Sequence, residues 1–232
     1  NLPKRSKKKI KFIIIHYTGM KKESVAIKKL CNENTNVSAH YFIKKNGEII
    51  NLVPDLYEAW HAGKSNWKKL KFLNKNSIGI ELTNPGHQHG YEKFSFQQIS
   101  SLKKLLKYLI KKYRINLKFI LGHSDISPDR KKDPGEKFPW YLLAKSKLCF
   151  WHKLKQQNIK KFRRIKLSLK EQREFLINLK KIGYSNFNQK ISKSNKNLIF
   201  NIIPFQRRFR PSLINGIIDR EGLLISRNIL RL

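Results

Sequence analysis

Short apolar runs, each about the length of a β-strand, recur along the first 150 residues. The run at 10–15 is β-branched and almost continuous, and the run at 117–121 resembles it, as expected for strands covered on both faces. Residues 40–43 and 48–53 flank a turn that contains Asn46 and Gly47, a pair that favours a hairpin. These patterns predict four strands.

A fifth strand is predicted at 77–82, where apolar and polar residues alternate. Successive side chains of a strand point to opposite faces, so Glu81 lies on the face opposite Ile78 and Ile80. Glu81 is therefore not a core residue by its pattern.

Helical patterns separate these strands. Residues 21–32 form one candidate helix, and residues 95–113 form a second in which Ser95 and Gln98 make a capping box. The second helix carries one apolar stripe, made of Ile99, Leu102, Leu105, Leu106, Leu109 and Ile110. Alternating strands and helices predict an α/β domain over residues 1–150, with a mixed central β-sheet flanked by helices.

The pattern changes after residue 150. Residues 151–166 are basic and lack a clear apolar period at their start, which indicates a linker. In the domain predicted at 167–232, Ser168 and Glu171 form another capping box and Gly183 marks the end of that helix. Helical segments at about 198–209 and 222–230 complete a small three-helix domain.

The composition is strongly basic. The 232 residues include 51 Lys and Arg against 15 Asp and Glu, a formal net charge of +36. Such a surface attracts polyanions, including nucleic acid, anionic lipid and cell-wall polymer. The excess is mostly lysine spread along the chain, which a biased genome composition explains as well as a function does. Charge alone therefore selects no partner.

Cysteines and apolar runs limit the remaining possibilities. Cys31 and Cys149 are the two cysteines, so there is no disulfide framework, and both are expected to be buried. The basic run at 4–9 and the apolar run after it imitate a signal peptide, but the apolar run is short and indicates a strand. No run of about 20 apolar residues predicts a transmembrane span. The compartment is not readable, and lipid anchoring upstream of Asn1 stays open.

Candidate chemistry begins where two of the strands end. The run at 10–15 leads into His16, and the run at 117–121 leads through Gly122 into His123. Asp133 follows ten residues later, in a loop rich in Pro and Gly that is able to fold back on its start. Two imidazoles and a carboxylate form a three-ligand zinc site with one open position. Spacing alone also allows each histidine to be an ordinary hydrogen-bonded residue.

Five motifs, taken in order, resemble those of the type 2 N-acetylmuramoyl-L-alanine amidases. They are His16-Tyr17-Thr18, Ser38-Ala39-His40-Tyr41, Ala59-Trp60-His61-Ala62-Gly63, Ser77-Ile78-Gly79-Ile80-Glu81 and the run 123–135. The resemblance covers residues 10–145. It implies a zinc-dependent amidase that cuts the bond between N-acetylmuramic acid and L-alanine in peptidoglycan or muropeptides.

The resemblance also assigns roles. It implies one zinc ion held by His16, His123 and Asp133, with Glu81 as the catalytic carboxylate and Lys131 completing the site. Metal-assisted hydrolysis needs such groups, because a carboxylate moves the proton and a cation stabilises charge on the carbonyl oxygen. Without the family pattern, Glu81 is equally well explained as a solvated strand residue.

Further residues are expected around the substrate. The segment with Trp60 and His61 corresponds to a wall of the substrate groove in the resembled family, and His40 is a less certain substrate contact. Trp67 is expected to be structural. Four further residues near the site receive no ligand role. Asp125 and Asp129 are expected to shape the loop or to support the metal ligands, and His87 and His89 to form a groove edge without a second metal.

The C-terminal residues 203–211 and 216–219 resemble the three-helix peptidoglycan-binding domain. Phe205 and Phe209 are four positions apart, so packing of an ordinary helical bundle also explains them. With this domain, we expect a monomer in the periplasm or facing the cell envelope, whereas a cytoplasmic recycling amidase is the alternative location. The preference for anhydro or intact muropeptides is not readable.

Two other functions compete. A peptidoglycan recognition protein without catalysis shares the fold but usually lacks a metal ligand, and this chain retains all three candidates. Binding of nucleic acid is suggested by charge alone, and no recognised nucleic-acid-binding motif supports a specific complex.

Overall fold

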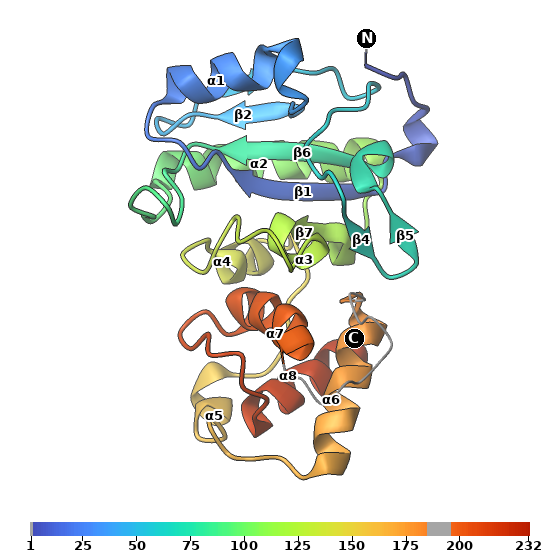
Figure 1. Cartoon of the computed structure of the whole chain (residues 1–232), viewed down its shortest axis with the longest axis vertical. Coiled ribbons are helices and arrows are strands. Elements are labelled where there is room, and N and C mark those ends of the chain that lie inside the picture. Colours follow the sequence, from blue (N-terminus) through green and yellow to red (C-terminus); the bar gives the residue numbers. More distant parts are fainter. Residues whose placement is uncertain (1, 185–195) are drawn as a thin grey trace.

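A mixed five-stranded sheet forms the centre of the computed structural model, which describes residues 2–184 and 196–232. Strands run in the order β3-β2-β6-β1-β7 (Figure 1). Their bounds are β1 Phe12–Tyr17, β2 Tyr41–Ile43, β3 Ile49–Asn51, β6 Ser77–Leu82 and β7 Ile120–Gly122. The predicted α/β class with a mixed sheet is confirmed: β2 and β3 are antiparallel, whereas β6 is parallel to β2 and β1, and β1 is parallel to β7.

The two faces of the sheet have different partners. Ile13 and Ile15 of β1, with Ile78 and Ile80 of β6, pack against the apolar stripe of α2 (Phe96–Tyr113). The Ser95 capping box begins this helix as predicted. On the opposite face, Phe12, Ile14 and Leu121 belong to a second buried cluster. His16 and Glu81 follow on this second face, side by side in the register of β1 and β6.

Shorter elements connect these layers, and some differ from the predicted pattern. The run at 117–121 starts as a 3₁₀ helix, η4 (Leu117–Phe119), because the side chain of Asn116 caps the backbone N–H of Lys118. The small hairpin of β4 and β5 was not predicted. The other elements of this part are η1 Lys7–Lys9, α1 Glu23–Cys31, η2 Glu33–Thr35, β4 Asn66–Trp67, β5 Leu70–Lys71, η3 Leu73–Asn76, α3 His123–Ile126 and α4 Trp140–Lys145.

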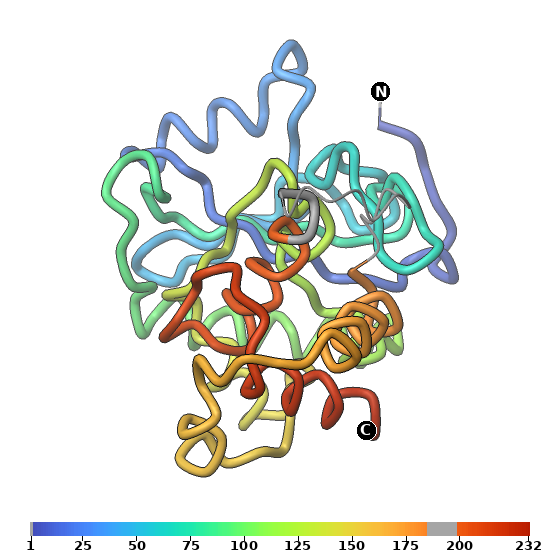
Figure 2. Tube along the Cα trace, turned by 60° about the horizontal axis from the view of Figure 1, so that its bottom comes forward, coloured from blue at the N-terminus to red at the C-terminus, as the bar shows by residue number. Residues whose placement is uncertain are grey.

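The C-terminal part is helical, as predicted. Its elements are α5 Gln156–Lys160, α6 Leu169–Ile182, α7 Lys196–Phe209 and α8 Arg220–Leu230. The three longer helices gather on one side of the molecule (Figures 1 and 2). Pro204 lies inside α7. The stretch predicted as a linker contains α5, whose Ile159 is buried. Domain boundaries at 150 and 167 stay a prediction.

The helices share a core with the sheet domain. One buried cluster contains Phe12 and Leu121 of the sheet together with Phe175 of α6 and Phe205 of α7. The contact also includes a buried polar network. The carboxylate of Asp125 in α3 accepts hydrogen bonds from Tyr184 Oη at 2.7 Å and from Arg208 Nη1 at 2.8 Å. Asp125 thus joins α3 to the C-terminal helices, a contact that the sequence did not predict.

Replacing Asp125 with alanine is expected to lower the free energy of unfolding by about 3–5 kcal/mol, because the guanidinium of Arg208 then stays buried without its counter-charge. Urea unfolding followed by circular dichroism measures the difference. Asp129, an exposed acid in the segment that follows α3, provides the control, and its alanine variant should unfold like the wild type. A loss below about 1 kcal/mol for the Asp125 variant would show that the pair is not coupled to folding.

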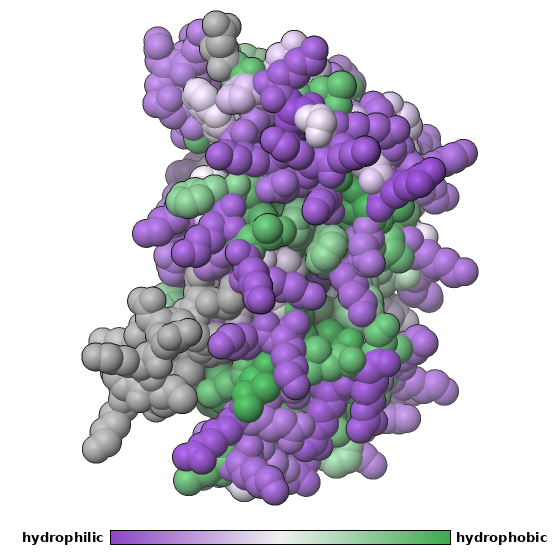
Figure 3. All heavy atoms as spheres, turned by 90° about the vertical axis from the view of Figure 1, so that its right-hand side faces the viewer, coloured by the Kyte–Doolittle hydropathy of each residue, from purple (hydrophilic) through white to green (hydrophobic). Residues whose placement is uncertain are grey.

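The surface agrees with the basic composition. Hydrophilic side chains cover most of the face in Figure 3, and apolar ones appear mainly near its middle and lower half. None of the helices in the described part combines the length and apolar character that crossing a bilayer requires. The prediction that both cysteines are buried is wrong for Cys31, which is exposed at the end of α1, and correct for Cys149.

Candidate metal centre and active-site groove

His16, His123 and Asp133 meet at one edge of the sheet. Strands β1 and β7 are parallel neighbours, so the residues at their carboxyl ends lie close together. His16 Nδ1 lies 3.0 Å from His123 Nδ1 and 3.0 Å from Asp133 Oδ2, and His123 Nδ1 lies 3.1 Å from the same oxygen. Asp133 reaches this point because its loop folds back, with its carbonyl accepting the N–H of Ser124. All three side chains are buried.

A chain of hydrogen bonds determines where His16 carries its proton. The hydroxyl of Ser77 donates to the carbonyl of Leu73 at 2.6 Å, so Ser77 Oγ accepts from His61 Nε2 at 3.1 Å. Burial holds the pKa of His61 well below its ordinary value, and the neighbouring His16 lowers it further, so the ring of His61 is neutral. Because Nε2 of this neutral ring carries the hydrogen, its Nδ1 is an acceptor. That atom accepts from His16 Nε2 at 3.0 Å. The Nδ1 of His16 is left with a lone pair.

The proton of His123 is fixed in a similar way. Its Nε2 lies 3.3 Å from the carbonyl oxygen of Ala62, which only accepts, so Nε2 carries the hydrogen. When His123 is neutral, its Nδ1 therefore also presents a lone pair to the centre. Hydrogen bonds of this kind to the remote ring nitrogen orient histidine ligands in metal sites.

When both imidazoles are neutral, as they are when they bind a metal, the three atoms form a set of acceptors without a proton between them. Burial and the adjacent His123 lower the pKa of His16 to about 4, so this ring is neutral at neutral pH. Burial opposes ionisation of Asp133, but the neighbouring imidazoles outweigh it and hold the pKa of Asp133 below its ordinary value. Lone pairs about 3 Å apart in a buried site repel one another unless a cation lies between them. Two imidazoles and a carboxylate suit zinc, and ligands about 2 Å from one ion fit this spacing. It is the one such group of potential ligands within residues 2–184 and 196–232.

Glu81 lies beside the metal centre. Its backbone is the register partner of His16, and its Oε2 is buried with no hydrogen-bond partner in the described residues. Burial and the negative charge of Asp133 raise the pKa of Glu81 to about 8, whereas the ammonium of Lys131 opposes the rise. A carboxyl group with its pKa near neutrality both accepts and returns a proton readily. The sequence predicted the position of Glu81 but not this shift.

Glycine at position 79 makes room for the hydrogen-bond chain. A Cβ placed on Gly79 would lie 2.3 Å from Cγ of His61, so a larger residue would displace that ring. Gly79 and Glu81 lie on the same face of β6, so the motif that supplies the carboxylate also supplies the space for the ring of His61. The sequence predicts His61 as a substrate contact and does not reveal that its Nδ1 accepts the hydrogen bond of His16 Nε2. The spacing between His61 and Ser77 carries no signal that reveals their contact.

A groove of about 690 Å³ opens above the metal centre. Trp60, His61 and Lys131 line it, as does the His87 loop that was predicted as a groove edge. The basic side chains along it are Lys29, Arg130, Lys131 and Lys132, and the acidic ones in the described lining are Glu81 and Asp133. Apart from these two acids at the centre, the walls therefore favour a substrate that carries carboxylates.

The groove edge is tied to the C-terminal helices. His87 Nδ1 lies 2.9 Å from Tyr17 Oη, and its Nε2 lies 3.1 Å from Glu136 Oε2. The same carboxylate accepts from Arg207 Nε of α7 at 3.3 Å. His87 is thus held in place by Tyr17 and Glu136 at the edge of the groove.

His40 does not line the groove, which corrects its assignment as a substrate contact. Its ring is fully buried, where Nδ1 accepts the N–H of Gly79 at 3.0 Å and Nε2 donates to the carbonyl of Tyr57 at 3.0 Å. Burial and the nearby charge of Arg5 lower the pKa of His40 to about 3. His40 therefore connects β6 to the segment around Tyr57 and has no free atom for a ligand.

Comparison with known proteins identifies relatives of the whole chain. The family model for N-acetylmuramoyl-L-alanine amidase matches residues 6–136. AmiD, an N-acetylmuramoyl-L-alanine amidase of Escherichia coli, is 34% identical over 234 residues, which cover 96% of this chain and 83% of AmiD. AmpD of Haemophilus influenzae, a 1,6-anhydro-N-acetylmuramyl-L-alanine amidase, is 43% identical over 105 residues, which cover 45% of this chain and 55% of AmpD.

Solved structures agree with these relatives. The complex of E. coli AmiD with anhydro-N-acetylmuramic acid-L-Ala-D-gamma-Glu-L-Lys matches with a TM-score of 0.84 and 32% identity, covering 96% of this chain and 89% of AmiD. AmpDh3 of Pseudomonas aeruginosa, in complex with anhydromuramic pentapeptide, matches with a TM-score of 0.82 and 29% identity, covering 95% and 91% of the two chains. Both matches extend through the C-terminal helices.

Proposed function

Because this chain belongs to the N-acetylmuramoyl-L-alanine amidase family, we propose that it uses one zinc ion, held by His16, His123 and Asp133, to hydrolyse its substrate. The bond cut is the amide between the lactyl group of N-acetylmuramic acid, or of its anhydro form, and L-alanine of the stem peptide. This activity places the enzyme in peptidoglycan turnover and recycling. The observation that supports zinc is the set of three converging lone pairs described above.

The residues around the centre divide the chemistry. Zinc bound there supplies a Lewis acid, which acidifies water and polarises the scissile carbonyl. Glu81 takes a proton from the attacking water as its oxygen bonds to the carbonyl carbon. Lys131 stabilises the negative charge that develops on the carbonyl oxygen. Glu81 then gives the proton to the alanine nitrogen as the C–N bond breaks, leaving a free amine and a lactyl carboxylic acid, which releases its remaining proton to solvent and becomes a carboxylate.

Removal of metal is expected to abolish peptide release from a muropeptide. The protein is treated with a chelator and dialysed, and the products are followed by mass spectrometry. Return of zinc should restore release, whereas magnesium should not, because magnesium prefers oxygen ligands and octahedral geometry. Hydrolysis that continues at the untreated rate after chelation would contradict the metal-dependent mechanism. It would also contradict the non-catalytic alternative, which predicts no release in any arm.

The groove and its relatives indicate the substrate class. The ligand in the AmiD complex carries a stem peptide with free carboxylates, and the basic groove walls provide complementary charge. We propose that both anhydro and reducing-end muropeptides enter, and that Trp60 and His61 form part of the wall they contact. Mass spectrometry of digests of each defined form, at equal concentration, measures the preference.

The C-terminal helices support a role in the cell envelope. We propose that they contribute to peptidoglycan binding and that the protein acts as a monomer in the periplasm or facing the envelope. The match to AmiD covers 96% of this chain, whereas the match to AmpD covers 45% of it. The high positive charge of the chain also favours adhesion to anionic polymer. Cosedimentation with purified peptidoglycan at several salt concentrations separates binding by the C-terminal helices from adhesion by charge, because adhesion by charge weakens as the salt concentration rises.

A further inference from the structure

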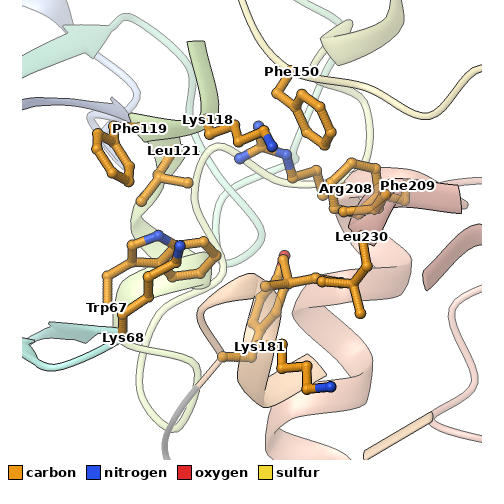
Figure 4. A pocket seen from close by; sticks show the side chains of 13 residues that line it. Trp67, Lys68, Lys118, Phe119, Leu121, Phe150, Lys181, Arg208, Phe209 and Leu230 are labelled. Atoms are coloured by element: carbon orange, nitrogen blue, oxygen red, sulfur yellow. The ribbon is translucent and has the colours of Figure 1, made fainter. Parts of the chain in front are cut away.

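A second cavity lies between the sheet domain and the C-terminal helices. It has a volume of about 100 Å³, and none of the three metal ligands lines it. Trp67, Phe119 and Leu121 come from the sheet domain, and Arg208 and Leu230 come from the helices opposite (Figure 4). A water molecule occupies about 30 Å³ of liquid, so the cavity suits a ligand of a few heavy atoms.

The walls of this cavity are fixed by close packing. The ring of Trp67 lies against the end of α6, where a Cβ on Gly183 would approach Trp67 Cε2 to 2.2 Å. Trp67 and Tyr184 also meet edge to face, with ring centroids 5.0 Å apart. On the other side, Arg208 is held by Asp125 Oδ2 and by the carbonyl of Ile120, through its two Nη atoms. The cavity is therefore part of the interface and not a gap between mobile surfaces.

Two hydrogen-bond donors at this cavity have no acceptor. Trp67 and Arg208 are 3% and 4% exposed, and neither Trp67 Nε1 nor Arg208 Nε has a hydrogen-bond partner in the part of the chain that the structure describes. A buried N–H without an acceptor is destabilising, because the hydrogen bond that it loses to water is not replaced. Two such groups beside one cavity indicate that an acceptor group occupies it.

The charge of the lining indicates an anion. Four of its thirteen residues are basic, namely Lys68, Lys118, Lys181 and Arg208, and none of the described lining residues is acidic. Asp125, the carboxylate that is hydrogen-bonded to Arg208, also accepts from Tyr184 Oη and from the N–H of Gly122. Aromatic and aliphatic side chains, including Phe150, Phe209 and Ile229, form the remaining walls and suit an apolar body.

We propose that this cavity binds a small carboxylate with a short apolar body, either a free acid or the carboxyl end of a peptide. The carboxylate accepts hydrogen bonds from the N–H groups of Trp67 and Arg208, and lysines such as Lys118 at the rim contribute charge. The apolar body contacts the aromatic walls. The site is separate from the metal centre, so its occupancy does not depend on amidase activity.

The indole N–H signal of Trp67 in a ¹H–¹⁵N correlation spectrum tests this proposal directly. The chain has four tryptophans, and loss of one signal in Trp67→Phe assigns the reporter. Titration with propionate is expected to move this signal saturably, with a dissociation constant of about a millimolar for so small a ligand. Propionamide, which has the same shape without charge, should bind at least about tenfold more weakly. N-acetylalanine, as a peptide end, distinguishes the two sources of the carboxylate.

Lysine variants complete the test without disturbing Arg208. Lys118→Met removes a rim charge and should weaken propionate binding about tenfold. Lys161→Met is the matched control, because Lys161 is also exposed and lies over an aromatic ring, but outside the cavity, and it should bind like the wild type. Absence of a saturable shift with both propionate and N-acetylalanine would overturn the proposal, as would equal binding of propionate and propionamide. Binding of inorganic phosphate without propionate would contradict the carboxylate class.

Discussion

Replacing Glu81 with glutamine is expected to lower the turnover of a muropeptide by about 10²- to 10⁴-fold, because glutamine has the same shape but does not carry the proton. Glu81 is the carboxylate beside the metal centre whose Oε2 has no protein partner in the described residues, so its loss leaves no neighbouring group that is already placed to replace it. Steady-state rates from mass spectrometry give the loss of turnover. Zinc content, measured by elemental analysis, should stay at one ion per chain.

Glu48→Gln is the control for that variant. Glu48 is a surface carboxylate paired with Lys44 at the β2–β3 hairpin, and its change should leave both turnover and zinc content at wild-type values. If the Glu81 variant loses zinc as well as activity, Glu81 contributes to metal binding and is not solely a proton carrier. Full activity in the Glu81 variant would remove Glu81 from the mechanism.

The sequence predicts features that depend on residues a few positions apart. Ser95 and Gln98 predicted the start of α2, and alternation at 77–82 predicted the face of Glu81. The metal candidates lie at the carboxyl ends of two parallel neighbouring strands, His16 near the end of β1 and His123 directly after β7, so a local pattern placed them at one edge of the sheet. The family motifs then selected Asp133 from a loop with several acids. Their assignment as zinc ligands is a proposal that the geometry supports.

Long-range contacts were not predictable in the same way. His61 lies behind His16, and His40 is fully buried against Arg5, yet both occur in similar motifs with aromatic neighbours. Which histidine faces the groove depends on how segments 35 and 45 residues apart pack together. Asp125 is a comparable case, because its partner Arg208 lies 83 residues away in α7. A pattern within a few residues carries no information about such pairs.

Replacing Asp133 with alanine is expected to remove zinc and to lower activity more than about 100-fold, since even residues that only support metal ligands cost about 10- to 100-fold when changed. The change deletes the one anionic ligand and leaves two neutral imidazoles, which hold a divalent ion far more weakly. Zinc should raise the unfolding temperature of the wild type, because it binds the folded state, and should leave that of the variant unchanged. Calorimetry with and without zinc measures this difference independently of turnover.

Two further variants make the Asp133 result specific. Asp129 is an exposed acid in the same loop, and Asp129→Ala should retain zinc, activity and the zinc-dependent shift in unfolding temperature. His61→Ala removes the acceptor of His16 Nε2, so the proton of His16 is free to move to Nδ1 and to block the metal. Its zinc affinity should fall about 10- to 100-fold, between the values of the other two variants. An Asp133 variant that binds zinc as tightly as the Asp129 variant would show that the three converging lone pairs are not the metal site, and the hydrolytic mechanism built on them would have to be abandoned.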